Sequence, residues 1–148
     1  MDRRNIFRGL FAAAAGVTAV SAAKAATSGN PDAARVAYHV DEFERVGFAL
    51  GNIGNHYEGM GGPAHVRIDL VILGPAMKAV VAASADEKLA KRLAGMQQNG
   101  LELWACVNTL RGMKLTIDDL LPGFKLADKG GVVKLAELQS QGWCYLRP

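Results

Sequence analysis

The sequence predicts an α/β domain in which a parallel sheet carries helices on both faces. Short runs of β-branched, aromatic and aliphatic residues alternate along the chain with longer segments whose apolar residues recur every three or four positions. The first pattern is typical of strands and the second of amphipathic helices. One run, VRIDLVIL at 66–73, becomes almost continuously apolar, as a strand covered on both faces does. Regular alternation of the two element types favours a parallel sheet.

Five short apolar runs are predicted to be strands, because polar residues, glycine or proline bound them. In chain order they are 35–40, 66–73, 101–105, 124–127 and 143–146. The segments between them are predicted to be helical, since most show helical spacing or a capping signal and several end at glycine or proline. In chain order they are 42–60, 76–83, 84–98, 108–113, a single turn opened by 116–119, and 132–141.

The helix starts have recognisable signals. Asp41 is well placed to cap the first helix, and the segments SADE at 84–87 and TIDD at 116–119 have the form of capping boxes. Residues expected to face the sheet lie on one stripe of each helix. They are Phe43, Val46, Leu50, Ile53 and Tyr57 in the first helix and Val132, Leu135 and Leu138 in the last.

The N-terminus has the three parts of a twin-arginine export signal. RRNIFR at 3–8 supplies the arginine pair, 9–23 is apolar and rich in alanine, and AKA at 23–25 is a cleavage site. The apolar run is too short for a comfortable membrane span. We therefore expect a signal at 1–25, a flexible mature N-terminus at 26–34, and a periplasmic protein without stable membrane insertion. The alternatives are an uncleaved anchor and a cytoplasmic protein with a chance arginine pair.

Composition limits the function classes. Removing the signal leaves about 120 residues, enough for one domain with a real core. The signal holds four bases and one acid, a net charge of +3, and the whole chain is also +3, so the mature domain is close to neutral. The basic composition is therefore no evidence for a nucleic-acid partner. The chain contains no CxxC, HExxH or GxxxxGK[ST] motif, and we expect no metal and no cofactor.

The stretch LELWACVNTLRGM at 101–113 runs from a predicted strand directly into a predicted helix, with Cys106 at the junction. Unpaired N–H groups and the helix dipole favour an anion at a helix N-terminus, so the pKa of this thiol should be lowered. Asn108 and Thr109 follow and could hold the turn or a ligand. The alternative is that Cys106 is only a small buried hydrophobic residue.

Other candidates follow from the rule that parallel sheets bind ligands at the carboxyl ends of their strands. That rule selects His39 and Asp41 after the first strand and Gly74 after the second. His39 is a candidate acid or base, or a structural histidine. Cys144 is expected to be a packing residue or an edge residue of the last strand. The glycine pairs 61–62 and 130–131 could form anion-binding nests, although such pairs are more often plain turns.

Several segments together resemble the DsrE/DsrF-like family of small sulfur-relay proteins, the group that includes the TusD and YchN proteins. The resemblance covers 35–148. Its segments are the first strand followed by VGFALGNIGNH, then VILGPAMKA, LELWACVNTLRGM, LTIDDLLPGF and GGVVKLAELQSQGWCYLRP. The family implies a three-layer α/β/α domain with a five-stranded, mostly parallel sheet, and homo-oligomers that are commonly trimers or hexamers.

The resemblance also implies a role for one residue. The family's functional cysteine stands at the end of the third strand, which is Cys106 here, and carries sulfur as a persulfide. In the family's strand order the third and last strands are not neighbours, which argues against a Cys106–Cys144 bridge. The export signal is a departure, because the best-known members are cytoplasmic and a transfer-RNA acceptor is implausible outside the cytoplasm.

Three functional hypotheses follow. The first is a periplasmic sulfur-trafficking protein, at most a carrier or transferase, in which Cys106 accepts sulfane sulfur from a donor protein or polysulfide and passes it to an acceptor. The second is a non-catalytic oligomeric module that binds a small ligand or a partner. The third is a thiol redox enzyme that uses Cys106 and Cys144, which requires the two sulfurs to come within bonding reach.

Overall fold

The computed structural model describes residues 33–148. The predicted export signal and residues 26–32 of the expected flexible segment lie outside the described residues. Within the described part, no helix is both long enough and apolar enough to cross a membrane.

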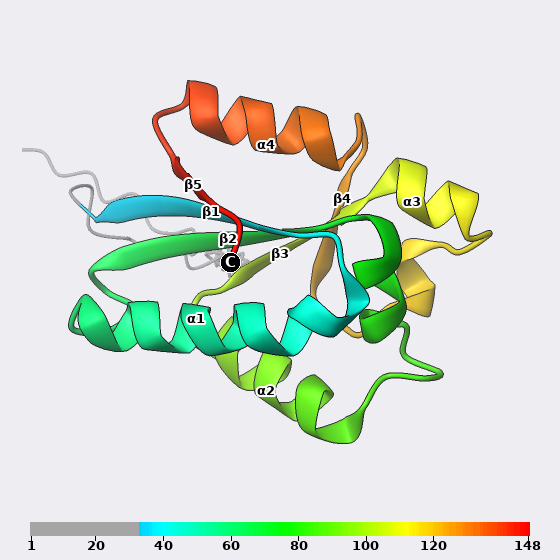
Figure 1. Ribbon diagram of the computed structural model, residues 1–148, viewed down its shortest axis with the longest axis horizontal. Helices are drawn as coiled ribbons and strands as arrows, with labels where there is room; N and C mark the ends of the chain where they lie inside the picture. Colours follow the sequence, from blue (N-terminus) through cyan, green and yellow to red (C-terminus); the bar gives the residue numbers. More distant parts are fainter. Residues whose placement is uncertain (1–32) are drawn as a thin grey trace, which may run out of the picture.

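A five-stranded sheet runs through the centre of the domain (Figure 1). Its strands are β1 (Ala34–Val40), β2 (Val66–Ile72), β3 (Glu102–Cys106), β4 (Phe124–Ala127) and β5 (Cys144–Leu146). The order across the sheet is β4-β3-β2-β1-β5, and every neighbouring pair is parallel. The predicted α/β class and five strands are confirmed, and the sheet is entirely rather than mostly parallel.

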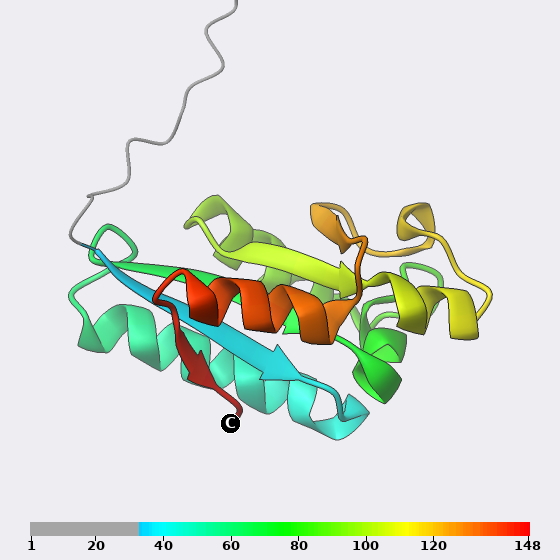
Figure 2. The same ribbon diagram turned by 90° about the horizontal axis from the view of Figure 1, so that it is seen from above.

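Helices cover both faces of the sheet, which gives the predicted three layers. The helix α1 (Val46–Gly59) and the helix α2 (Glu87–Gln98) lie on one face, and α4 (Gly131–Ser140) lies on the other (Figures 1 and 2). The short helix α3 (Val107–Gly112) begins directly at the end of β3. Three segments of 3₁₀ helix complete the fold: η1 (Phe43–Arg45), η2 (Gly74–Val80) and η3 (Ile117–Asp119).

The two faces of the sheet have separate apolar cores. The larger core packs α1 against the sheet through Val46, Leu50 and Ile53, which are almost completely buried. The smaller core lies under α4 and consists of Ala37, Val71, Leu135, Leu138 and Trp143. Each fully buried leucine or isoleucine contributes about 1.5–3 kcal/mol, so the larger core dominates the stability and the smaller one holds α4 in place.

Two predicted helix caps are wrong, and one predicted helix is of a different type. Asp41 does not cap the first helix, because its carboxylate accepts hydrogen bonds from Arg147 and the segment opens as the 3₁₀ turn η1. The N-cap of α2 is Asp86 rather than Ser84, and the Asp86 side chain accepts from the Leu89 N–H at 2.9 Å. The segment predicted as an apolar helix at 76–83 is the 3₁₀ helix η2. The capping box at 116–119 is confirmed and opens η3.

Two residues predicted to face the core are exposed. Phe43 is 49% exposed because it lies in η1, whose tighter winding turns it out of the stripe that continues along α1. Val132 is 70% exposed. The side of α4 that faces the sheet is set by Gly131, Leu135 and Leu138, and Val132 lies about 100° around the helix from Gly131.

Candidate functional site

Cys106 stands where two helices begin. It is the last residue of β3 and the N-cap of α3, with extended backbone angles of φ −71° and ψ 118°. Its side chain is buried, with 5% exposed. Because β3 turns into α3 without an intervening loop, the N–H groups of the first turn of α3 surround the sulfur. The predicted strand-to-helix junction is confirmed, with Cys106 inside the strand rather than just after it.

Burial and polar contacts have opposite effects on this thiol. Burial raises the pKa of Cys106, but the backbone N–H groups of Gly131, Thr109 and Asn108 and the Thr109 hydroxyl lower it further than burial raises it. The resulting pKa lies below the ordinary value of 9.0. Donors that point at the thiolate stabilise the charged form. The site therefore favours the nucleophilic thiolate.

The first turn of α4 completes the site, and sequence reasoning did not assign it this role. A Cβ atom at Gly131 would lie 3.1 Å from the Cys106 Cβ and 3.0 Å from Leu73 Cδ2. At Gly130, where φ is +101°, a Cβ would lie 2.7 Å from the Asn108 Nδ2. The glycine pair is thus more than a plain turn, because it lets the N-terminus of α4 approach the thiol. Two glycines before a predicted helix were the only sequence signal.

Thr109 joins the thiol to the end of β2. The Gly74 N–H donates to Thr109 Oγ1 at 2.9 Å. Because the oxygen accepts that bond, the hydroxyl proton of Thr109 remains free to point at the sulfur of Cys106. Gly74 has φ +57°, and a Cβ there would lie 3.2 Å from the Asp41 carbonyl oxygen. The structure thus brings four predicted candidates together: Cys106, Asn108, Thr109 and Gly74.

We predict that Thr109→Val raises the pKa of the Cys106 thiol, because the valine cannot donate to the sulfur. The same substitution leaves the Gly74 N–H without an acceptor and should cost about 1–3 kcal/mol of stability. Alkylation rates of Cys106 as a function of pH, measured in a Cys144→Ser background, report the thiol pKa. Thr109→Ser keeps the hydroxyl and should behave as the parent. An unchanged pH profile in Thr109→Val would show that the hydroxyl does not act on the sulfur.

His39 belongs to a separate group at the end of β1. Its Nδ1 lies 2.8 Å from the Tyr145 hydroxyl oxygen, while its Nε2 is buried and has no hydrogen-bond partner in the part of the chain that is described. Burial lowers the pKa of His39, with Asp41 raising it and Arg147 lowering it more weakly. The strand β2 separates β1 from β3, so about 10 Å lies between their backbones. The polar contact of His39 is thus with Tyr145 of β5, on the side of β1 away from β3.

Asp41 likewise pairs away from the thiol. Arg147 donates to both Asp41 carboxylate oxygens, at 2.9 and 3.0 Å, and also to Glu42 at 3.3 Å. Tyr145 and Arg147, which sequence reasoning missed, both come from the C-terminal segment. They reach the end of β1 because β5 pairs beside it. The structure therefore does not place the side chains of His39 and Asp41 with Cys106, although the Asp41 backbone carbonyl lies near Gly74.

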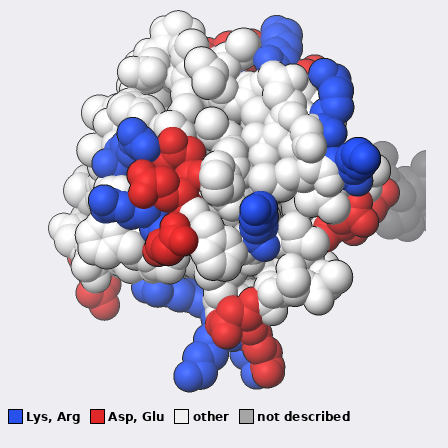
Figure 3. Space-filling model, turned by 45° about the vertical axis from the view of Figure 1, so that its right-hand side comes forward, with Lys and Arg blue, Asp and Glu red and all other residues white. Residues whose placement is uncertain are grey.

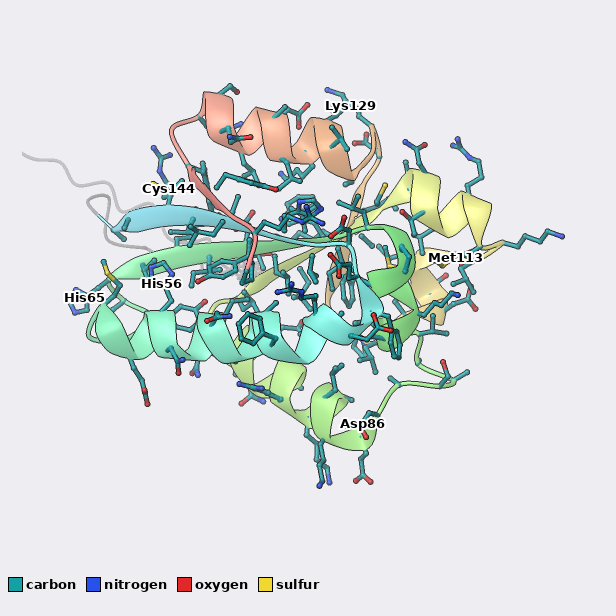
Figure 4. All side chains as sticks on the ribbon, in the orientation of Figure 1. His56, His65, Asp86, Met113, Lys129 and Cys144 are labelled. Carbon is teal, nitrogen blue, oxygen red and sulfur yellow. The ribbon has the colours of Figure 1, made fainter. Side chains whose placement is uncertain are left out.

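The two cysteines are far apart and both are free. Three strand spacings separate β3 from β5, about 14 Å, whereas the Cα atoms of a disulfide lie at most about 7 Å apart. Cys144 also stands at the start of its strand and Cys106 at the end of its own, and Figure 4 shows Cys144 at the end of the sheet opposite α3. The redox pair of the third hypothesis is excluded. Of the two structural roles expected for Cys144, its exposure on the outer strand β5 fits an edge residue.

Charged residues do not form a continuous field on the face seen in Figure 3. Small groups of both signs are scattered over a largely uncharged surface there. This face therefore has no basic patch of the kind that binds a nucleic acid. Among residues 33–148, no three His, Cys, Asp or Glu side chains converge as metal ligands.

Comparisons with known proteins agree with this architecture. No curated protein matches the chain. The protein of unknown function MTH1491 from Methanobacterium thermoautotrophicum is 29% identical, with a TM-score of 0.69 over 78% of this chain and 99% of that one. The ychN protein from E. coli shares the fold at 14% identity, with a TM-score of 0.61 over 78% of this chain and 99% of that one. A protein of unknown function from Bacteroides thetaiotaomicron, BT1422, is 15% identical, with a TM-score of 0.57 over 77% of this chain and 94% of that one.

The expected family resemblance is confirmed by the match to a family model. The model described as "DsrE/DsrF-like family" matches residues 6–148, nearly the whole sequence. Together with the parallel five-stranded sheet that its structural neighbours share, this match shows that the chain belongs to the DsrE/DsrF-like family.

Proposed function

We propose that the protein traffics sulfur in the periplasm and carries a sulfane sulfur as a persulfide on Cys106. The observation that carries the proposal is the position of this thiol, buried where the first turns of α3 and α4 meet, with a lowered pKa. Membership of a family associated with sulfur relay supports the same chemistry. The arginine pair and cleavage site at the N-terminus support export.

Loading is a thiol exchange. The Cys106 thiolate attacks the outer sulfur of a donor persulfide, R–S–SH, so that a bond forms between Cys106 Sγ and that sulfur. The S–S bond of the donor breaks, and the donor leaves as the thiolate R–S⁻, which takes a proton from water. The proton of the transferred sulfur stays with it. A larger thiolate fraction at Cys106 speeds this step, and no metal or organic cofactor takes part.

Delivery reverses the roles. An acceptor thiolate attacks the outer sulfur of the Cys106 persulfide, and Cys106 leaves as its thiolate. A thiol of low pKa is a good leaving group, so the same N–H groups assist both half-reactions. Donor and acceptor are proteins or polysulfides, since a transfer-RNA acceptor does not fit an exported protein.

A homo-oligomer, a trimer or hexamer by family resemblance, is part of the proposal. The outer edge of β5 is unpaired by any other described strand. Near it Tyr145 and Leu146 are 39% and 40% exposed, and exposed apolar side chains beside a sheet edge are typical of a surface that another chain covers. Size-exclusion chromatography with light scattering measures the state, and a monomer at micromolar concentration would contradict this part.

Incubation with a polysulfide, followed by removal of the excess and intact mass measurement, tests the central proposal. We expect the mass of one sulfur atom to be added per chain and to be removed by cyanide, which takes up sulfane sulfur as thiocyanate. A protein that gains no sulfur would contradict the proposal.

The alternative function is a non-catalytic binding module, and one observation favours it. An open hollow of about 350 Å³ lies beside β5, away from the thiol, lined by Tyr38, Asn52, Asn55, His56, Leu146, Arg147 and Pro148. The Tyr38 hydroxyl and His56 Nδ1 are 3.0 Å apart within it. A thiol unreactive toward an alkylating probe, with wild-type-like behaviour of Cys106→Ala, would favour this function.

A further inference from the structure

Trp104 links the sheet below α4 to the first turn of that helix. It precedes Cys106 by two residues in β3, so both side chains point to the same face of the sheet. The Lys134 Nζ lies 3.5 Å from the centroid of the Trp104 ring, a close cation–π contact. The backbone N–H of Lys134 donates to the Gly130 carbonyl at 3.0 Å and closes the first turn of α4. Lys134 therefore fastens that turn to Trp104.

Asp69 fixes Trp104 from within the core. Its side chain is 3% exposed, and its Oδ2 accepts from the Trp104 Nε1 at 2.8 Å. Its Oδ1 has no partner among the described residues. Burial raises the pKa of Asp69, while the Trp104 bond, Arg67 and Lys134 lower it and Glu102 raises it. A buried carboxyl is costly unless it is bonded, so the indole N–H is held firmly and the ring keeps one orientation.

The first turn of α4 has few other anchors. Val132 and Val133 are 70% and 40% exposed, so the apolar contacts of the helix come from its later turns. The Lys129–Glu137 ion pair at 3.1 Å is exposed and therefore weak. Yet this turn must be held closely, because Gly131 contributes an N–H to the Cys106 sulfur and an added Cβ there would lie only 3.1 Å from the Cys106 Cβ.

We propose that Asp69 and Trp104 are positioning residues for Cys106, which act through Lys134 to hold the first turn of α4 against the thiol. This inference rests on the proposed function only in that both concern the thiol of Cys106. Asp69, Trp104 and Lys134 would hold the N–H of Gly131 at the sulfur whether or not the thiol carries a persulfide.

Lys134→Met tests the proposal in a Cys144→Ser background, with the rate of alkylation by iodoacetamide measured against pH. We expect the apparent pKa of Cys106 to rise by about half to one unit, and the rate at neutral pH to fall about three- to tenfold. Asp69→Leu removes the acceptor of the Trp104 N–H and should shift the profile in the same direction. Lys134→Arg keeps a cation over the ring and should stay close to the parent.

Lys125→Met is the matched control. Lys125 lies over the same ring, with its Nζ 5.6 Å from the centroid, but it belongs to β4 and not to α4. Its removal should leave the profile unchanged. An equal shift in Lys125→Met and Lys134→Met would overturn the proposal, because a loss of nearby positive charge would then explain both.

An unchanged profile in Lys134→Met would also overturn the proposal. Lys134 is half-buried on the surface of α4, so this variant decides the matter even if Asp69→Leu fails to fold. Iodoacetamide reports the thiolate without any sulfur transfer. A parent protein that never loads sulfur, together with the shift in Lys134→Met, would support this inference and refute the proposed function. A parent that loads sulfur, with no shift in Lys134→Met, would support the proposed function and refute this inference.

Discussion

Replacing Cys106 by serine is expected to abolish sulfur loading completely. A persulfide requires a thiolate nucleophile, and the hydroxyl of serine is neither acidic enough nor nucleophilic enough to attack a sulfane sulfur at neutral pH. The substitution is nearly isosteric and leaves the ends of α3 and α4 in place. Intact mass after polysulfide treatment should therefore show no added sulfur, while circular dichroism shows the native fold.

The chain supplies its own matched control in Cys144→Ser. Cys144 is exposed at the start of β5, at the end of the sheet opposite Cys106. We expect this variant to load one sulfur per chain, as the parent does. Equal loading of Cys106→Ser and the parent would mean that the sulfur is carried elsewhere than on Cys106. Loss of loading in Cys144→Ser alone would mean that Cys144, and not Cys106, carries the sulfur.

Gly131→Ala is expected to impair both the stability and the thiol. The new Cβ would lie 3.1 Å from the Cys106 Cβ and 3.0 Å from Leu73 Cδ2, so α4 or the end of β3 must shift. Overpacking of this kind costs about 1–3 kcal/mol, which outweighs the gain of less than about 1 kcal/mol that alanine brings to a helix. As the N–H of residue 131 moves away, the thiol pKa should rise and the alkylation rate at neutral pH should fall about tenfold.

Gly95→Ala separates this effect from the general effect of alanine in a helix. Gly95 lies inside α2, and a Cβ there would meet nothing within 4 Å. This variant should be stabilised by about 0.5–1 kcal/mol and keep the parent's thiol pKa. Chemical denaturation and alkylation measure the two quantities. A Gly131→Ala protein as stable and as reactive as the parent would mean that the first turn of α4 does not need glycine there.

The sequence predicted the half of the site that is local in the chain. Cys106, Asn108 and Thr109 lie within one strand-to-helix turn, so residue spacing alone indicated a thiol at a helix N-terminus. Gly131 could not be assigned, because its distance from Cys106 depends on how β4 returns the chain and on which side of α4 faces the sheet. The same dependence explains why Val132 was wrongly placed in the core.

Long-range pairing explains the remaining differences. The carboxyl-end rule correctly selected His39 and Asp41 as residues at the carboxyl end of β1. Their partners, Tyr145 and Arg147, come from a last strand that pairs with β1, and no local pattern shows where that strand will dock. The docked C-terminal segment contacts the side chains of His39 and Asp41. The groups that act on the Cys106 thiol are therefore Thr109 and the N–H groups of the first turns of α3 and α4.

The lowered thiol pKa also predicts a pH dependence of stability. The native state has the lower thiol pKa, so it binds the proton less tightly than the unfolded chain does. Stability should therefore rise as the pH increases through the native pKa towards the ordinary value of 9.0. Denaturation midpoints compared between the Cys144→Ser protein and its Cys106→Ser derivative isolate this contribution. A difference that does not vary with pH in this window would contradict it.

Direct titration of Cys106 is the measurement that bears most closely on the activated thiol. In the Cys144→Ser protein the ultraviolet absorbance of the thiolate reports a single group, and alkylation rates give the same midpoint independently. We predict a midpoint clearly below the ordinary value of 9.0, as the convergence of α3 and α4 on the sulfur requires. A midpoint at or above that value would mean that burial outweighs the surrounding N–H groups, and that Cys106 is a packed side chain rather than a sulfur carrier.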